Sequence, residues 1–73
     1  MILNAIIEKD DDGYFAQILE LKGCVTQGNT YEEALFNIKE AAELYLDSLK
    51  AEELKVFQQR SVSITPIEVS IHA

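Results

Sequence analysis

Three consecutive aspartates, Asp10 to Asp12, form the densest group of chemically capable side chains in this sequence of 73 residues. Carboxylate oxygens are the ligands that Mg²⁺ and Ca²⁺ prefer. A calcium loop of the EF-hand type spaces its acids alternately and closes with a distant glutamate, and this run does neither. With Gly13 after it, the run has the composition of a solvent-exposed hairpin tip. The hairpin tip is the favoured interpretation, and a cation site is the alternative.

Nucleophilic catalysis is not indicated by the remaining reactive side chains. The only histidine, His72, lies near the end of the sequence, where chains usually fray, so a triad built on it is disfavoured. The only cysteine, Cys24, lies in an apolar stretch and is expected to be a small core residue. The sequence therefore predicts neither an enzyme nor a bound cofactor.

Charge and glycine spacing argue against nucleic-acid or nucleotide binding. The three glycines lie at separate turns without a phosphate-loop spacing, and the six Lys and Arg residues are scattered. The formal net charge of −7 and the pI of about 4.4 give a field that repels a phosphate backbone. The same field attracts basic proteins. We expect a cationic protein partner and no direct nucleic-acid contact.

Alternating apolar residues predict the strands that position the aspartates and the cysteine. Strands are expected over residues 2–9 and 14–21, joined by the Asp-Gly hairpin, with a short third strand over 24–27. A fourth strand is expected from Val62 to Ile71, and Pro66 marks a bulge or an edge within it. These strands should form a mostly antiparallel twisted sheet.

One helix is predicted between the third and fourth strands. Thr30 and Glu33 form a capping box in which the Thr hydroxyl accepts from the Glu33 amide and the Glu carboxylate accepts from the Thr30 amide. The apolar period fails at Glu53, which predicts an end between Lys50 and Glu52. The fold class is thus α+β, a two-layer βββαβ domain with one helix packed on one face.

The predicted helix has a buried arc and an outer face. The buried arc holds Leu35, Ile38, Ala42, Tyr45, Leu46 and Leu49. The outer face holds Glu33, Asn37, Glu40 and Asp47, but also the apolar Phe36 and Leu44. These two, and the sheet face that a single helix leaves bare, form more apolar surface than a soluble monomer usually exposes.

Length and composition indicate one small domain over residues 1–73 that associates. A domain of this size buries only about 60% of its unfolded surface, so its core is small. With 48% hydrophobic residues, we expect a homodimer or homotetramer. The apolar start has no basic region before it and is too short to span a membrane, which favours a cytoplasmic protein without membrane contact.

Three runs occur in a fixed order: Asp12-Gly13-Tyr14-Phe15-Ala16, then Leu21-x-Gly23-Cys24-x-Thr26-Gln27-Gly28-x-Thr30-x-Glu32-Glu33-Ala34, then Asn37-Ile38-Lys39-Glu40-Ala41. Together they resemble the signature of HicB-like antitoxins over residues 12–50. The resemblance implies a partial ribonuclease-H-like fold without the nuclease active site. It also implies an antitoxin that blocks a small, basic, RNA-cleaving toxin of the HicA type, and it implies dimers or tetramers.

The segment after the predicted helix departs from the fuller members of this family. Those members carry a helix-turn-helix or ribbon-helix-helix module that binds the operon's own promoter. Here about twenty residues with a strand pattern and no basic helix follow. Transcriptional autoregulation by this chain alone is therefore not expected.

Our first hypothesis is a non-catalytic antitoxin that masks the active or RNA-binding surface of its toxin. A stand-alone self-assembling module without a toxin is the second. The third, retained ribonuclease-H chemistry, needs carboxylates from several elements around two metal ions, whereas the aspartates share one turn. Charge and expected exposure select these interface candidates: Asp10, Asp11, Asp12, Glu33, Phe36, Glu40, Leu44 and Asp47.

Overall fold

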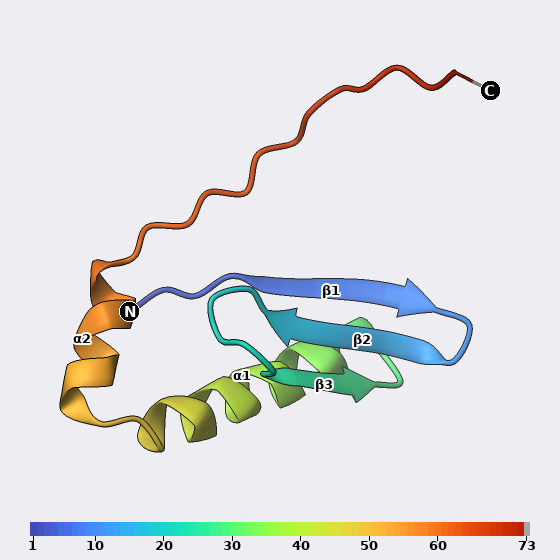
Figure 1. Cartoon of the computed structure of the whole chain (residues 1–73). Coiled ribbons are helices and arrows are strands. Elements are labelled where there is room, and N and C mark those ends of the chain that lie inside the picture. Colours follow the sequence, from blue (N-terminus) through green and yellow to red (C-terminus); the bar gives the residue numbers. More distant parts are fainter. Residues whose placement is uncertain (73) are drawn as a thin grey trace.

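A computed structural model describes residues 1–72 and shows one antiparallel sheet followed by two helices (Figure 1). The strands β1 (Ala5–Asp10), β2 (Gly13–Ile18) and β3 (Val25–Gly28) lie side by side in chain order. Helix α1 (Tyr31–Asp47) packs on one sheet face and contacts all three strands, and helix α2 (Ala51–Gln59) follows it. The predicted α+β class, with a helix layer on a sheet, is confirmed.

The hairpin between β1 and β2 forms where the aspartates predict it. Asp10 pairs with Gly13, so Asp11 and Asp12 are the two turn residues. The backbone N–H of Asp12 donates to a carboxylate oxygen of Asp10 at 2.8 Å, which closes the turn locally. Gly13 takes a φ of +138°, a conformation that favours glycine, whereas both turn aspartates keep negative φ.

At the start of α1, one of the two hydrogen bonds of the predicted capping box is present, and the other has a different donor. The backbone N–H of Glu33 donates to the Thr30 hydroxyl oxygen at 3.0 Å, as predicted. The Glu33 carboxylate, however, accepts from the N–H of Asn29 at 3.1 Å and not from that of Thr30. The long Glu side chain reaches one residue further back, which also ties the end of β3 to the helix.

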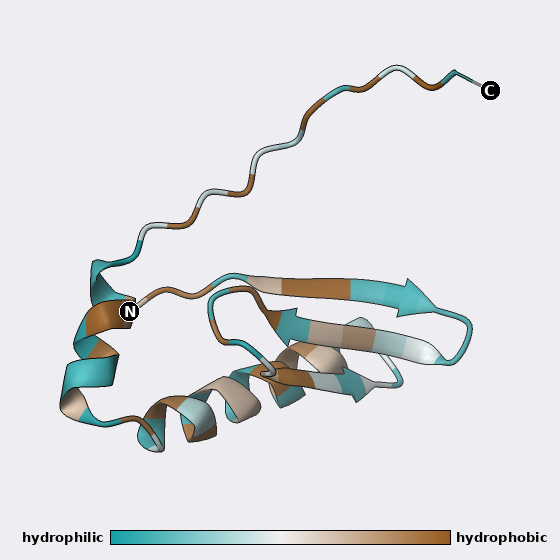
Figure 2. Ribbon diagram, viewed as in Figure 1, coloured by the Kyte–Doolittle hydropathy of each residue, from teal (hydrophilic) through white to brown (hydrophobic). Residues whose placement is uncertain are grey.

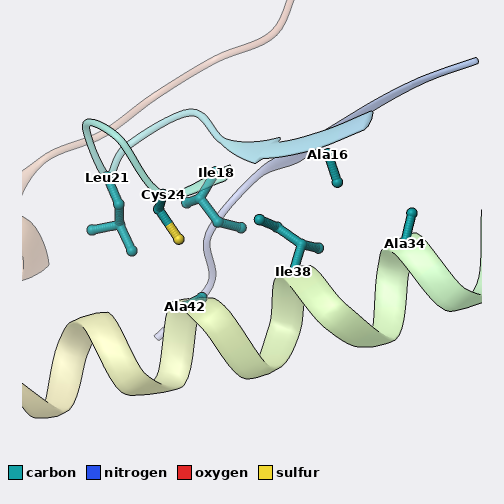
Figure 3. Close-up of a cluster of buried hydrophobic side chains, with 7 residues drawn as sticks. All are labelled: Ala16, Ile18, Leu21, Cys24, Ala34, Ile38 and Ala42. Atoms are coloured by element: carbon teal, nitrogen blue, oxygen red, sulfur yellow. The ribbon is translucent and has the colours of Figure 1, made fainter. Parts of the chain in front are cut away.

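The core lies between α1 and the sheet. Its buried members are Ala16, Ile18, Leu21, Cys24, Ala34, Ile38 and Ala42, and Figure 3 shows them facing one another across the two layers. Cys24 is 5% exposed, which confirms the prediction that it is a core residue. Leu35, expected on the buried arc, is instead 43% exposed because the structure places it on a flank of the helix that no strand covers.

The predicted end of the helix is wrong by several residues. α1 ends at Asp47, and Ser48 caps it by donating its side-chain hydroxyl to the Tyr45 carbonyl at 2.6 Å. A new helix, α2, starts after Lys50, whose N–H donates to the Glu53 carboxylate at 3.1 Å. The break resets the helical phase, so the apolar period of α1 could not predict α2. Within residues 1–72, neither helix is long and apolar enough to cross a membrane.

The fourth strand is not formed within the described residues. Residues 61–72, here called the C-terminal segment, run extended away from the body without pairing to the sheet (Figure 1). Its apolar side chains are largely exposed, with Ile67 at 79% and Ile71 at 87%. The predicted βββαβ order is therefore corrected to βββαα. Alternation predicts strand geometry, but a strand also has to pair with a neighbouring strand, and within the described residues the C-terminal segment pairs with none.

Candidate partner-binding surface

A hollow of about 460 Å³ lies between the β1–β2 hairpin and the start of α1. Three carboxylates line it: Asp10 and Asp12 from the hairpin, and Glu33 from the first turn of α1. We call this feature the acidic hollow. The other residues that line it are Gly13, Tyr14, Phe15, Gln27, Gly28 and Asn29.

The sheet register brings these distant acids together. Tyr14 of β2 pairs with Gly28 of β3, so the hairpin lies beside the strand end that leads into α1. A Cβ on Gly28 would lie only 2.5 Å from the backbone nitrogen of Ala34, so glycine permits a close approach of β3 and the helix. The Asn37 side chain adds to this contact by donating to the Gln27 carbonyl at 3.0 Å. Asn37, expected on the solvent side, is half-buried for that reason.

The second feature is a line of exposed side chains along α1, which we call the outer stripe: Glu33, Phe36, Glu40, Leu44 and Asp47. At about 100° per residue, these five positions fall within an arc of roughly 80°, opposite the buried face of the helix. Phe36 is 67% exposed and Leu44 is 66% exposed. The outer stripe therefore combines two apolar side chains with three carboxylates on one solvent-facing surface.

The structure groups the predicted interface candidates into one continuous region. Asp10, Asp12 and Glu33 meet at the acidic hollow, and Glu33 is also the first residue of the outer stripe. Asp11 is exposed at the hairpin tip but does not line the hollow. The region thus extends from the turn along α1 to Asp47.

Sequence reasoning did not select Tyr14, Gln27 or Asn29, which also line the acidic hollow. The Tyr14 ring meets the Tyr31 ring edge to face, with centroids 6.5 Å apart, and this pair supports the hollow where the sheet meets α1. No periodic pattern marks these residues. Only the strand register, with Tyr14 opposite Gly28, could have predicted them.

The acidic side chains of residues 1–72 do not form a metal site. No group of three His, Cys, Asp or Glu side chains in this range is arranged to hold a metal ion, and that includes the three turn aspartates.

A buried carboxylate anchors the loop after β2. Glu20 accepts hydrogen bonds from both the backbone N–H and the side-chain amide of Asn4. Its carbonyl accepts from the Arg60 guanidinium at 3.3 Å. Burial by itself raises the pKa of Glu20, but the hydrogen bonds from Asn4 and the charge of Arg60 outweigh it, so the pKa is lower than usual. Glu20 thereby joins the segment before β1 to the end of α2.

The sheet face opposite α1 is bare within the described residues. Ala16 and Ile18 point toward the helix, so the alternate residues Phe15 and Gln17 point away from it. Ile6 pairs with Gln17 across the β1–β2 ladder, and Val25 pairs with it on the other side. Phe15 and Val25 are exposed and Ile6 is half-buried. This face adds apolar surface to that of the outer stripe.

A small α+β domain whose surface is acidic and whose helix exposes apolar side chains fits the class of protein-binding modules. The comparison with protein families is specific: the model for the HicB-like antitoxin of bacterial toxin-antitoxin systems matches residues 3–69. The chain therefore belongs to the HicB-like antitoxin family, and its relationship to a toxin-antitoxin system rests on this membership.

Relatives of similar length come from distant organisms. A UPF0150 protein of Helicobacter pylori is 57% identical over 70 residues, covering 96% of this chain and 97% of the relative. A UPF0150 protein of Thermoplasma acidophilum is 46% identical, covering 89% and 96%. A third, from Synechocystis, is 43% identical, covering 90% and 84%. No solved structure matches the chain.

Proposed function

We propose that this protein is a cytoplasmic antitoxin that neutralises a small basic RNA-cleaving toxin of the HicA type by covering its active or RNA-binding surface. Membership of the HicB-like family supports a toxin partner. The observation that carries the proposal is the continuous surface formed by the acidic hollow and the outer stripe. Neutralisation by contact needs only such a surface, because a toxin whose RNA-binding face is covered cannot reach its substrate.

Charge would bring the two proteins together. An RNA-binding toxin carries Lys and Arg residues where it contacts phosphates. The net charge of −7 steers such a partner toward this chain, and the acidic hollow offers Asp10, Asp12 and Glu33 in place of those phosphates. The volume of the hollow, about 460 Å³, leaves room for a long basic side chain. This protein and RNA would then compete for the same cationic groups of the toxin.

Apolar contact would hold the complex once it has formed. Phe36 and Leu44 lie two helical turns apart, about 12 Å along the axis at 1.5 Å per residue. Exposed aromatic and aliphatic side chains on one helix face are suited to act as anchors in a partner's groove. The surrounding carboxylates Glu40 and Asp47 would form the polar rim of this contact.

The proposed function requires no catalysis and no cofactor. Ribonuclease-H chemistry requires carboxylates from different elements to converge on two metal ions. Here Asp10, Asp11 and Asp12 belong to one turn. A nuclease assay on an RNA–DNA hybrid with Mg²⁺ should therefore give no turnover above background. Turnover that EDTA abolishes would contradict this part of the proposal.

The proposal predicts that a small basic protein is encoded beside this one, and that protein would provide the test. Co-expression should relieve the growth arrest that the toxin causes, and the two chains should purify together. Phe36→Asp should weaken the complex at least tenfold, about the loss expected for an interface anchor. Val56→Asp is the matched control, because Val56 is 59% exposed on α2, outside the outer stripe. Equal loss for both variants, or recovery of this chain alone, would overturn the proposal.

The alternative is a stand-alone self-assembling module without a toxin partner. The specific observation in its favour is the exposed, strand-patterned C-terminal segment. The genomic neighbourhood discriminates between the two: the antitoxin needs an adjacent reading frame for a small basic protein, and the stand-alone module does not. Growth rescue by co-expression would then exclude the alternative.

A further inference from the structure

The outer edge of β1 offers hydrogen-bonding groups to another strand. The Leu19 amide donates to the Asn4 carbonyl at 2.9 Å, which places residue 4 among the hydrogen-bonded pairs of the β1–β2 ladder. Because these pairs alternate in antiparallel strands, Ala5, Ile7 and Lys9 direct their N–H and C=O groups to the opposite side. Within residues 1–72 no strand pairs with that side. This edge can therefore accept one more strand.

An apolar groove lies directly beside this edge. It has a volume of about 470 Å³ and runs between the start of β1 and the flank of α1. Its apolar lining includes Leu3, Leu35, Ile38, Ala42 and Leu46. α1 overhangs β1 here, which is why Leu35 is exposed despite its position on the apolar arc. A strand added to β1 would lie about 4.8 Å outward and would place alternate side chains over this groove.

The C-terminal segment has the pattern that such a strand needs. Its apolar residues alternate as Val62 and Ile64, and then as Ile67, Val69 and Ile71. Figure 2 shows these apolar positions recurring along the extended segment between polar ones. Except for Val62, which is half-buried, all are exposed. The segment is thus extended and amphipathic. The rest of the described chain leaves its apolar side chains uncovered.

The body of the same chain directs this segment outward. Arg60 is held at the start of the segment by its hydrogen bond to the Glu20 carbonyl and by its position 5.8 Å from the centre of the Phe57 ring. After α2 the segment runs away from the body of the chain (Figure 1). The radius of gyration is 14.7 Å, against about 11 Å for a compact domain of this length. The segment therefore extends beyond the body of its own chain.

The low charge of the C-terminal segment allows a second copy to be its neighbour. Two particles of net charge −7 repel one another, so their contact should be made by a neutral surface. The C-terminal segment contains no Lys or Arg and one carboxylate, Glu68, whereas the other twelve acids lie before it. It can approach the groove of another copy without adding to the repulsion.

From the edge, the groove and the segment, we propose that two copies exchange C-terminal segments, each segment adding a strand to β1 of the other copy and covering its groove. The exchange is reciprocal, so the dimer closes on itself. It leaves the acidic hollow and the outer stripe uncovered, since none of their residues lines the groove. This inference does not depend on a toxin, and its failure would leave the proposed function intact.

The mass of the purified full chain tests the exchange. Sedimentation equilibrium should give a dimer, twice the 8.2 kDa of one chain. The variant Ile67→Asp with Val69→Asp should raise the dimer dissociation constant at least tenfold, because it places carboxylates against the groove. The variant Ser63→Asp with Ser70→Asp adds the same charge to the polar side of the segment and should change it less than about threefold. A monomer, or a dimer that both variants affect equally, would overturn the proposal.

A second measurement distinguishes exchange from docking within one chain. Isotope-labelled and unlabelled copies are mixed, and contacts between chains are recorded by isotope-filtered NMR. We expect contacts between the methyl groups of Ile67 or Val69 and Leu35 or Leu46 of the other copy. The amides of Ala5, Ile7 and Lys9 should exchange slowly. Contacts found only within one chain, or fast exchange of these three amides, would refute the strand exchange.

Discussion

Glu20 combines a negative charge with a position that is 8% exposed. Such a carboxylate is tolerated because Asn4 donates to it twice and Arg60 is close by. The lowered pKa has a definite consequence for folding. A carboxyl whose pKa is lower in the folded state than in the unfolded state stabilises the fold above the unfolded pKa. That stabilisation is lost as the pH falls through the folded pKa.

We therefore predict that Glu20→Gln lowers the free energy of unfolding by about 1 kcal/mol at neutral pH, since it exchanges charged hydrogen bonds for neutral ones. The difference from the wild type should shrink as the pH falls below the ordinary value of 4.5. Urea unfolding at a series of pH values measures it. If the difference in the free energy of unfolding stayed constant down to the lowest pH measured, the charge of Glu20 would not be its cause.

Cys24 gives a second prediction at this scale. Burial raises the pKa of the Cys24 thiol, so little thiolate forms near neutrality and little of it can reach a reagent. The native protein should react with a disulfide reagent at least about tenfold more slowly than the protein in denaturant. A Ser63→Cys variant, with its new thiol on the exposed C-terminal segment, provides the rapid reference. Equal rates for native and denatured Cys24 would refute the prediction.

At the scale of elements, the approach of β3 to α1 depends on Gly28. An added Cβ would lie 2.5 Å from the Ala34 nitrogen and 3.0 Å from its Cα, and both are backbone atoms that cannot move aside cheaply. We predict that Gly28→Ala lowers the free energy of unfolding by about 1–3 kcal/mol, the usual range for overpacking. Asn29→Ala, one residue later and exposed, should cost much less. Similar midpoints in urea for the two variants would contradict this account.

Which elements the sequence predicts correctly depends on the range of the interactions that form them. The Asp10–Gly13 hairpin and the Thr30 cap arise from contacts within four residues, and local patterns predicted both. α2 was missed because Ser48 and Lys50 reset the helical phase, after which Leu54 and Phe57 are the half-buried positions. The strand expected near Pro66 has the right alternation, but its pairing depends on an edge that local pattern cannot specify.

At the scale of the whole molecule, the candidate surface could be predicted only in part. Charge and helical period predicted that Phe36, Glu40 and Leu44 would be exposed on one face, and the structure confirms their exposure. That Asp10 and Glu33 share a hollow could not be predicted from spacing. Their meeting requires the pairing of three strands and the return of α1 across them.

The acidity of the molecule predicts how complex formation responds to salt. Between low salt and about 0.5 M salt, the association rate with a basic toxin should fall at least tenfold, since steering between separated charges is screened. The variant Asp10→Asn with Glu33→Gln should reduce this dependence. The variant Glu52→Gln with Glu68→Gln removes the same charge outside the candidate surface and should affect it less. Stopped-flow measurements provide the rates, and an association rate independent of salt would refute the electrostatic part of the proposal.

The exposed C-terminal segment also bears on how long the protein survives in a cell. An extended, unpaired stretch with accessible apolar side chains is the kind of site where proteolysis begins. Exchange between two copies would hide that stretch, so dilute protein would be degraded quickly and concentrated protein slowly. The lifetime of the protein would then rise with its own abundance, and the cell would keep a reserve only where synthesis exceeds a threshold.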